Sequence, residues 1–302
     1  MAMVPNCLDS ISGGNRTEPE SRDTLKADQN IEASGKSRLI GKGRNADVFD
    51  NGDGTVLKVY RPEVPTTLYL QDYEISKAVS RHYEKMPVVH GLKDLKPYPG
   101  LIFEKIDGPN LLEAIGKNLF KTGSYAKEFA KTHLDIHRHS FEGLPRQKDV
   151  LIREMARTAL PGKDVDDIIA FTEALPDGDR LCHNDFMPTN VVLSERGIIV
   201  IDWRTASRGN ALADVARTLI LHEVPREDIG IPAVMDLVRR FFINVYLKEY
   251  LKLARVAKAE VEKWMLPLSA IRLGEGVSEK EGKILLGRIG RQLKAHRSGR
   301  RA

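Results

Sequence analysis

The chain has 302 residues, of which 41% are hydrophobic and 29% are charged, so it has enough apolar material for one large domain or two lobes. Its net charge of +5 lies at one end, because residues 283–302 contain seven lysines and arginines and no acids. The remainder carries a net charge of −2, and this composition does not favour a nucleic-acid-binding protein. We interpret the basic tail as a solvated helix end.

The cysteine content and hydropathy exclude two further classes. Cys7 and Cys182 are too few for a disulfide framework and lack the spacing of a metal-binding knuckle. No apolar run approaches the roughly 18 residues that a membrane-spanning helix needs, and the first residues lack the apolar stretch of a signal peptide. We therefore expect a soluble cytoplasmic protein without membrane contact.

Residues 1–35 are expected to form a flexible leader, since they contain paired glycines and no aromatic side chain. Short strand-like runs at residues 37–40, 47–50 and 55–60 follow, separated by glycines and an Asn-Gly-Asp-Gly turn, and predict an antiparallel meander. A helix is predicted over residues 68–83, where Ile75, Ala78, Val79 and His82 recur at helical spacing and Glu74 lies on another face.

The organisation changes after an apolar run at residues 101–103, where Gly108 and Pro109 interrupt the chain. We place a nucleotide-binding N-lobe at residues 36–107 and a catalytic and acceptor-binding C-lobe at residues 108–302. Helices are predicted over residues 125–139, 150–159, 163–175, 211–222, 233–251 and 260–273. A hairpin of residues 190–193 and 198–202 interrupts these helices.

A glycine-rich loop, GKGRNA at residues 41–46, lies between two predicted strands, and Lys58 stands in the next one. This strand–loop–strand context differs from a dinucleotide-binding fingerprint, which must open a helix, and matches a kinase glycine loop. Backbone N–H groups near Gly41 and Gly43 can approach phosphates closely, and the fixed cation of Lys58 offsets their charge. Glu74, on the following helix, is expected to orient Lys58 by an ion pair.

A second motif contains the chemistry. Asp185, Asn190 five residues later, and Asp202 at the end of the next predicted strand provide one candidate base and two oxygen ligands around a tight hairpin. Phosphoryl transfer from ATP needs such a set, because Mg²⁺ neutralises phosphate oxygens and a carboxylate accepts the proton of the attacking hydroxyl.

With these motifs in order, the chain resembles the aminoglycoside phosphotransferase and choline kinase family of the protein-kinase-like fold over roughly residues 37–286. The shared features are the glycine loop, Lys58, the His183-x-Asp185-x-x-x-x-Asn190 motif, Ile201-Asp202-Trp203 and the segment GNALADVAR at residues 209–217. The resemblance implies a two-lobed α+β fold, with a five-stranded antiparallel N-lobe sheet plus one helix and a mainly helical C-lobe.

The resemblance also implies roles for individual residues. Asp185 is the expected catalytic base, Asn190 and Asp202 are the Mg²⁺ ligands, and Lys58 binds the phosphates of ATP, for which GTP is an alternative. Phe103 would precede the hinge, with the Glu104 carbonyl and the Ile106 amide facing adenine. His183 and Asp214 are expected to be structural residues beside the site, with Asp214 bracing the catalytic loop. Trp264, Arg272 and Glu275 are candidate acceptor contacts, with core packing as the alternative role of Trp264.

Several departures and alternatives remain at this point. Asn184 stands where aminoglycoside kinases usually have glycine, and the His-Asn-Asp form is closer to choline-kinase-like members. The Asp-Phe-Gly and Ala-Pro-Glu motifs of protein kinases are absent, which favours a small-molecule hydroxyl acceptor. His133 and His137 lack the glutamate of a zinc motif and are read as core or pocket-edge residues.

Two other functions stay open: a nucleotide-binding pseudokinase that acts as an interaction module, and an atypical protein Ser/Thr kinase. The acceptor is expected to be an aminoglycoside, a choline-like amine or a sugar-like molecule. The sequence does not choose among them, and it does not give the oligomeric state.

Overall fold

The computed structural model describes residues 37–43, 45–95 and 98–299, so the expected leader at residues 1–35 lies outside the described residues. The N-terminal part of the structure contains one sheet with the order β1-β2-β3-β5-β4, in which every neighbouring pair is antiparallel. Its strands are β1 (Arg38–Lys42), β2 (Ala46–Asp50), β3 (Thr55–Tyr60), β4 (Val89–Leu95) and β5 (Tyr98–Glu104). The predicted five-stranded antiparallel sheet is confirmed.

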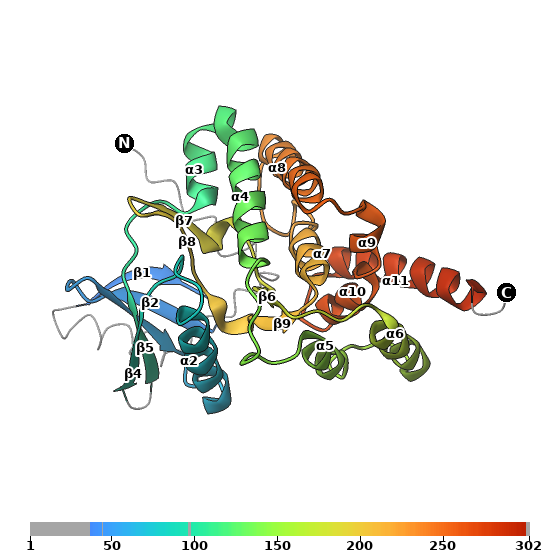
Figure 1. The fold of residues 1–302 in the computed structure, drawn as a ribbon, viewed down its shortest axis with the longest axis horizontal. Coiled ribbons are helices and arrows are strands. Elements are labelled where there is room, and N and C mark those ends of the chain that lie inside the picture. The colour runs from blue at the N-terminus through green and yellow to red at the C-terminus, as the bar shows by residue number, and fades with distance from the viewer. Residues whose placement is uncertain (1–36, 44, 96–97, 300–302) are drawn as a thin grey trace.

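A single helix, α2 (Thr66–Ser80), covers this sheet and contacts β4 and β5 (Figure 1). The two faces of the sheet have separate cores. Ala46, Tyr60 and Leu101 are buried in the cluster that contains Tyr69 and Tyr73 of α2. Phe49, Leu57 and Val59 form the cluster of the other face, as expected for alternating residues of a strand.

The chain leaves β5 through Gly108, which has a φ of 142°. A Cβ atom there would lie 2.1 Å from the Leu193 carbonyl oxygen, so only glycine fits this close backbone approach. The Leu193 amide then donates to the Pro109 carbonyl at 2.9 Å. These contacts join the start of the helical half to the hairpin that the sequence predicts around residues 190–202.

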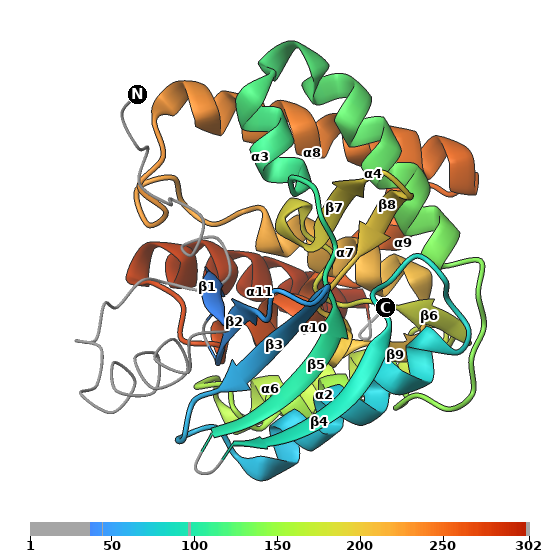
Figure 2. The same ribbon diagram turned by 90° about the vertical axis from the view of Figure 1, so that its left-hand side faces the viewer.

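The remaining chain is mainly helical, as Figure 2 shows from the side of the sheet. In chain order it contains α3 (Leu111–Lys117), η1 (Leu119–Lys121), α4 (Thr122–Ile136), α5 (Gln147–Met155), α6 (Gly162–Ala174), β6 (Arg180–Cys182), η2 (Pro188–Asn190), β7 (Val191–Ser194), β8 (Gly197–Val200), η3 (Trp203–Thr205), β9 (Ser207–Gly209), α7 (Ala211–Leu221), α8 (Ala233–Ala254), α9 (Lys258–Glu262), α10 (Met265–Leu273) and α11 (Glu279–Gly299). The predicted α+β kinase-like fold is confirmed.

Two predictions about the C-terminal helices need correction. The helix predicted over residues 260–273 is two helices, α9 and α10, which meet at Trp264. Pro267 explains the break, because it has no N–H to donate to the Lys263 carbonyl and is tolerated only in the first turn of α10.

Among the helices of the described residues, none combines the length and hydropathy needed to cross a bilayer.

The basic tail is not only a solvated helix end. Leu285, Ile289 and Leu293 recur every four residues along α11 and are buried, and α11 contacts α10. Its arginines pair with acids of the same chain: Arg288 with Glu223 at 2.5 Å, and Arg297 with Asp164 and Asp167 at 2.7 and 2.6 Å. Arg288 and Arg297 therefore form ion pairs within the chain.

Candidate active site

The loop between β6 and η2 holds the candidate base, Asp185. Asn184, one residue before it, has a φ of 60°, a left-handed conformation that glycine and asparagine tolerate better than other residues. This conformation explains why asparagine can replace the usual glycine of the family at this position. The Asn184 side chain donates to the Thr205 carbonyl and the Ser207 hydroxyl, both at 2.8 Å, and thereby joins this loop to η3 and β9.

The hairpin of β7 and β8 brings the two candidate metal ligands to the same place. Asn190 ends η2, and its Nδ2 donates to the Asp185 carbonyl at 2.8 Å. Asp202 follows β8 with a φ of 62°, and the preceding Ile201 amide donates to the Asn190 carbonyl at 2.9 Å. Asp185, Asn190 and Asp202 therefore lie together, as the sequence predicts.

The predicted partner of Lys58 is wrong. Lys58 Nζ lies 2.8 Å from Asp72 of α2 and 3.0 Å from Asp202, whereas Glu74 is exposed. Asp72 is 1% exposed and also accepts hydrogen bonds from the Tyr60 hydroxyl and from Ser76. Because successive helix residues point about 100° apart, Asp72 faces the sheet and Glu74 faces away.

Electrostatics separate the two carboxylates of the site. Lys58 lowers the pKa of Asp202 to about 2, so Asp202 stays ionised. Burial, and then the charge of Asp202, raise the pKa of Asp185 above its ordinary value, while His183 and nearby arginines oppose this shift. A raised pKa makes Asp185 a better proton acceptor than an ordinary aspartate.

The predicted bracing role of Asp214 agrees with the geometry. Asp214, on α7, accepts the backbone amides of His183 at 2.6 Å and of Asn184 at 2.7 Å, one with each carboxylate oxygen. His183 is itself buried: its Nε2 donates to the Ile201 carbonyl at 3.0 Å, and its Nδ1 accepts from the Asp185 amide at 3.2 Å. His183 and Asp214 thus hold the backbone around Asp185.

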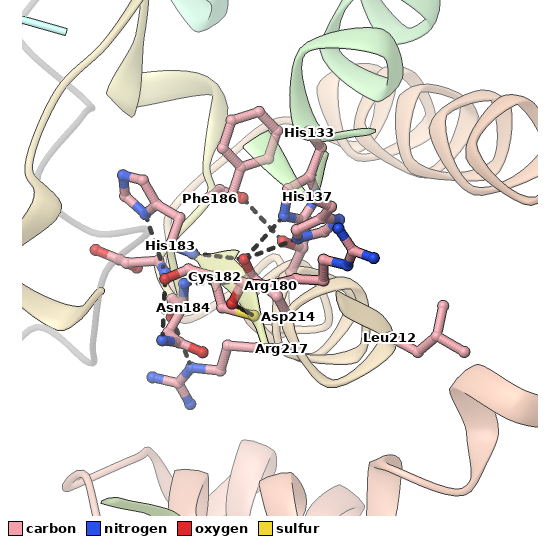
Figure 3. A network of polar contacts seen from close by, with 12 residues as sticks. His133, His137, Arg180, Cys182, His183, Asn184, Phe186, Leu212, Asp214 and Arg217 are labelled. Carbon is pink, nitrogen blue, oxygen red and sulfur yellow. Dashed lines mark hydrogen bonds and ion pairs between the residues drawn. The ribbon is translucent and has the colours of Figure 1, made fainter. Parts of the chain in front are cut away.

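Behind this loop lies a buried network, shown in Figure 3. His133 of α4 and His137, the C-cap of that helix, place Nε2 3.1 and 3.2 Å from Asp214 Oδ2. Their Nδ1 atoms contact the hydroxyls of Tyr246 and Tyr250 at 2.7 and 2.6 Å. Burial lowers the pKa of His133 to about 3, so this ring is neutral at neutral pH.

His133, His137 and Asp214 also have the spacing of a metal site, since their ligand atoms lie within 4.8 Å of one another. Both Nδ1 atoms contact tyrosine hydroxyls, and both Nε2 atoms lie within 3.2 Å of Asp214, which also holds the catalytic loop. We therefore read the cluster, here called the Asp214 clamp (His133, His137, Asp214, Tyr246 and Tyr250), as structural, in agreement with the prediction of buried histidines.

A cavity of about 1020 Å³ contains the site. Gly43, Lys58, Asp185, Asn190, Asp202, Arg272 and Glu275 line it, and its wall continues along α5 and α10. Trp264 is only 2% exposed, belongs to the hydrophobic core and is not among the described lining residues, which favours core packing over contact with the acceptor. Arg272 is also buried, where it pairs with Glu281 and Glu275 at 2.7 and 2.9 Å.

The two glycines of the loop differ in what they require. A Cβ atom at Gly43 would lie 2.9 Å from the Ala46 carbonyl, which accepts the Gly43 amide at the same distance. Gly41 has ordinary space for a Cβ, 3.7 Å from Val48. The close turn therefore needs glycine at position 43, and Gly41 lies at an irregularity in the β1–β2 register.

The predicted hinge residues lie at the end of β5. Phe103 pairs with Val56 of β3, and the Glu104 amide donates to the Val88 carbonyl at 2.9 Å. The Glu104 side chain is also engaged, with the Val88 amide at 3.1 Å and Arg196 at 2.9 Å. Among the described residues, Phe103, Glu104 and Ile106 do not line the cavity, so their contact with adenine stays a prediction.

Sequence reasoning missed four residues of this site. Besides Asp72, Gln147 at the start of α5 donates to Asn184 Oδ1 at 3.0 Å and accepts the Asn210 amide at 2.9 Å. Arg204 and Arg217 line the cavity, although both stand inside motifs that the sequence analysis quotes. For Asp72 a signal exists, since it lies three, four and seven residues before the buried Ile75, Ser76 and Val79.

The fold consists of a five-stranded sheet with one helix and a mainly helical part, and one lysine and three amide or carboxylate residues meet in the cavity. This combination defines a kinase-like phosphotransferase. The chain belongs to the phosphotransferase enzyme family, whose family model matches residues 36–244. Enzymes of this family phosphorylate hydroxyl groups, and this protein is accordingly a phosphotransferase with an alcohol group as acceptor. No match was found among the curated proteins.

Solved structures have the same fold at low sequence identity. A thermostable mutant of aminoglycoside phosphotransferase APH(4)-Ia, in ternary complex with AMP-PNP and hygromycin B, is 17% identical with a TM-score of 0.60, covering 90% of this chain and 98% of that one. A choline/ethanolamine kinase family protein from Mesorhizobium loti is 16% identical with a TM-score of 0.53, covering 90% and 97%.

Proposed function

We propose that the protein is an ATP-dependent small-molecule kinase that transfers the γ-phosphoryl group to a hydroxyl with the help of Mg²⁺. The observation that carries this proposal is the joint position of Lys58, Asp185, Asn190 and Asp202 in one cavity. These are the cation, base and oxygen ligands that phosphoryl transfer from ATP needs. GTP is the alternative nucleotide.

Nucleotide binding is supported by the loop and by Lys58. The backbone around Gly41 and Gly43 and the ammonium group of Lys58 would receive the phosphates, and the main chain at Glu104 and Ile106, after Phe103, would receive the base. Two structural neighbours were crystallised with AMP-PNP or ATP, which agrees with this role. The carboxylates of Asp72 and Asp202 hold Lys58 in position from two sides.

The donor set fits Mg²⁺. Asn190 uses Nδ2 for its hydrogen bonds to Asp185, and Asp202 uses Oδ1 for Lys58, so Asn190 Oδ1 and Asp202 Oδ2 have no hydrogen-bonding partner among the described residues. Oxygen atoms of this kind are the ligands that Mg²⁺ prefers, and Asp202 is ionised. When bound, the ion would neutralise phosphate oxygens and help to orient the triphosphate.

The reaction then follows from Asp185. Its carboxylate accepts the proton of the acceptor hydroxyl, the hydroxyl oxygen forms a bond to the γ-phosphorus, and the bond from that phosphorus to the β–γ bridging oxygen breaks to release ADP. The Asp214 clamp and His183 keep the Asp185 backbone in place, and Asn190 donates to its carbonyl.

The acceptor class of this proposal covers aminoglycosides, choline-like amines and sugar-like molecules. The APH(4)-Ia mutant is in complex with hygromycin B, and a further structure of the same fold, APH(2")-IIa, is in complex with streptomycin. Since these structures are at most 17% identical to the chain, they support the kind of reaction and do not select the acceptor. A pseudokinase or an atypical protein kinase remains an alternative, but no observation in the structure favours either one.

The test is Mg²⁺-dependent consumption of ATP and of GTP with a panel of aminoglycosides, choline, ethanolamine, amino sugars and nucleosides. We expect acceptor-dependent turnover that falls by about 10²–10⁴-fold in Asp185→Ala, the range typical of losing a general base. Nucleotide binding, measured by thermal shift, should survive in that variant. Full activity in Asp185→Ala would contradict the assignment of the base.

A further inference from the structure

The cavity is unusually cationic for a protein that would bind amines. Its lining contains seven basic and four acidic side chains among the described residues. The basic ones are Lys42, Lys58, Arg153, Arg157, Arg204, Arg217 and Arg272, and the acidic ones are Glu154, Asp185, Asp202 and Glu275. Lys42 and Lys58 belong to the nucleotide side of the cavity. We call the part lined by the five arginines the acceptor half; Arg204 borders both parts, since Asp202 and Asp72 as well as Asp185 act on its charge.

The acids of the cavity are already engaged. Glu154 pairs with Arg157 at 2.5 Å, and Glu275 pairs with Arg217 at 2.7 Å and with Arg272 at 2.9 Å. Asp202 pairs with Lys58 at 3.0 Å, which leaves Asp185, the proposed base. An aminoglycoside or another polyamine would therefore meet a surplus of guanidinium groups and no spare carboxylate in the described lining.

An aromatic cage for a quaternary ammonium group is also missing from the described lining. Tyr60 is its one aromatic residue, and its hydroxyl donates to Asp72. Quaternary ammonium ligands are normally held over several aromatic rings. The acceptor half offers aliphatic side chains instead, including Leu151, Leu268 and Ile271, which would contact a carbon skeleton.

Two arginines in this half lack full complements of partners. Arg217 Nη2 binds Glu275 and Nε donates to the Asn184 carbonyl at 3.4 Å, but the buried Nη1 has no acceptor in the described structure. Figure 3 shows Arg217 beside Asn184. The half-buried Arg204 side chain makes no hydrogen bond or ion pair with any described residue. Buried N–H donors without acceptors are rare and often mark a place where a ligand binds.

The same two side chains lie close to the reacting position. The positive charges of Arg217 and Arg204 both act on the Asp185 carboxylate and oppose the rise of its pKa by burial. Arg204 follows Asp202 by two residues, and Arg217 contacts the backbone of Asn184, the neighbour of Asp185. An anion bound by both arginines would thus be held next to the proposed base.

We propose that the acceptor is an anionic molecule, with a carboxylate or phosphate group that binds Arg204 and Arg217 while its hydroxyl faces Asp185. This inference rests on the proposed function. A guanidinium group matches the two oxygens of either anion with parallel hydrogen bonds, and the incoming oxygens supply the acceptor that Arg217 Nη1 lacks. The acceptor class is therefore a hydroxy acid, a sugar acid or a sugar phosphate, instead of an aminoglycoside or choline.

The first test measures binding without requiring the natural acceptor. The melting temperature of the full chain is titrated with sulfate, acetate or choline at constant ionic strength, with and without Mg²⁺ and a non-hydrolysable ATP analogue. We expect sulfate or acetate to raise the melting temperature and choline to have no effect. A larger response to sulfate indicates a phosphate-bearing acceptor, and a larger response to acetate indicates a carboxylate-bearing one.

Matched variants separate specific binding from general salt effects. Arg204→Gln and Arg217→Gln should each lose most of the anion-dependent shift, whereas Arg226→Gln, which removes a surface arginine paired with Glu227 outside the cavity, should keep it. The proposal is overturned if no anion shifts the wild type, if choline stabilises it equally, or if the shift survives in both cavity variants.

The second test compares turnover of four acceptors built on one ring: glucose, glucosamine, glucuronate and glucose 6-phosphate. If any is phosphorylated, an anionic member should have at least a ten-fold higher kcat/KM than glucose or glucosamine, and Arg217→Gln should remove that advantage. Preferred turnover of glucosamine would overturn the proposal. Failure of the nucleotide analogue to bind refutes the proposed kinase function instead, and the anion titration without nucleotide still decides the acceptor inference.

Discussion

Asp72 and Glu74 lie two residues apart on α2 but in opposite surroundings. Asp72 is buried against Lys58 and Tyr60, and Glu74 is exposed. Asp72→Asn should raise the KM for ATP about ten-fold or more and lower stability, because the lysine loses one of the two carboxylates that orient it. Glu74→Gln is the matched control and should leave KM and the melting temperature unchanged. A larger effect of Glu74→Gln than of Asp72→Asn on the KM for ATP would instead indicate that Glu74 is the partner of Lys58.

Trp264 is a second residue where geometry decides between two roles. It is buried in the core at the junction of α9 and α10 and does not line the cavity. Trp264→Phe should therefore lower the free energy of unfolding by about 1–3 kcal/mol through lost packing and leave the KM of any acceptor unchanged. Chemical denaturation and steady-state kinetics measure the two quantities. A raised KM at unchanged stability would show that Trp264 contacts the acceptor after all.

At the scale of elements, the junction between β5 and α3 depends on one glycine. Gly108→Ala would place a methyl group 2.1 Å from the Leu193 carbonyl at a φ of 142°, so the backbone must shift. We expect a loss of about 2 kcal/mol or more of stability from steric strain, at the upper end for a backbone substitution. Denaturant unfolding monitored by fluorescence measures it.

Gly116 provides the control for that substitution. It lies within α3, where a Cβ atom would meet nothing within 4 Å. Gly116→Ala should leave stability unchanged or raise it by up to about 1 kcal/mol, because alanine has the higher helix propensity. Equal destabilisation by both substitutions would mean that the close approach of Gly108 to β7 is not a determinant of the junction.

At the scale of the whole molecule, two buried histidines connect stability with pH. Burial lowers the pKa of His133 to about 3 and that of His222 to about 4, whereas both titrate near 6.5 in the unfolded chain. The unfolded state therefore binds more protons below pH 6.5. The stabilising effect of keeping these rings neutral is complete above that pH and is lost as the pH falls toward 4 and then 3.

Unfolding free energies measured from pH 8 to pH 4 test this linkage. In the wild type we expect the free energy of unfolding to decline below pH 6.5. In His222→Gln this free energy should fall less steeply with decreasing pH, because one titrating group is removed. Asp214, whose pKa is held well below its ordinary value mainly by His133 and His137 against burial, contributes at still lower pH. An unchanged slope in His222→Gln would contradict the assignment of that histidine.

Much of this fold and site follows from local sequence patterns. The glycine loop, Lys58, and the spacing of Asp185, Asn190 and Asp202 are short-range features, so a sequence can specify them before any packing is known. The strands β6 and β9 contain three residues each and are too short for a periodic signal. Contacts such as Gln147 with Asn184 join residues far apart in the chain, and only the tertiary fold reveals them.

The basic tail shows that the charge of a segment, like short strands and distant contacts, does not by itself predict its packing. Composition alone makes residues 283–299 appear as a free positive segment, but the buried leucines of α11 and its pairs with Glu223, Asp164 and Asp167 make it part of the core packing. Charge clusters at the level of sequence therefore say little about which cations are available to a ligand. In this molecule, Arg204 and Arg217, which the inference assigns to a ligand, stand outside that cluster and line the cavity.

The Asp214 clamp has a consequence for how such a molecule can change its specificity. None of His133, His137 and Asp214 lines the cavity, so these groups, which fix the backbone of the catalytic loop, are separate from the α5 and α10 side chains that form part of the cavity wall. Substitutions along α5 and α10 can accumulate without retuning the chemical step, provided that Gln147 is kept. Divergence, or redesign in the laboratory, can thus alter what the enzyme recognises while its reaction stays constant.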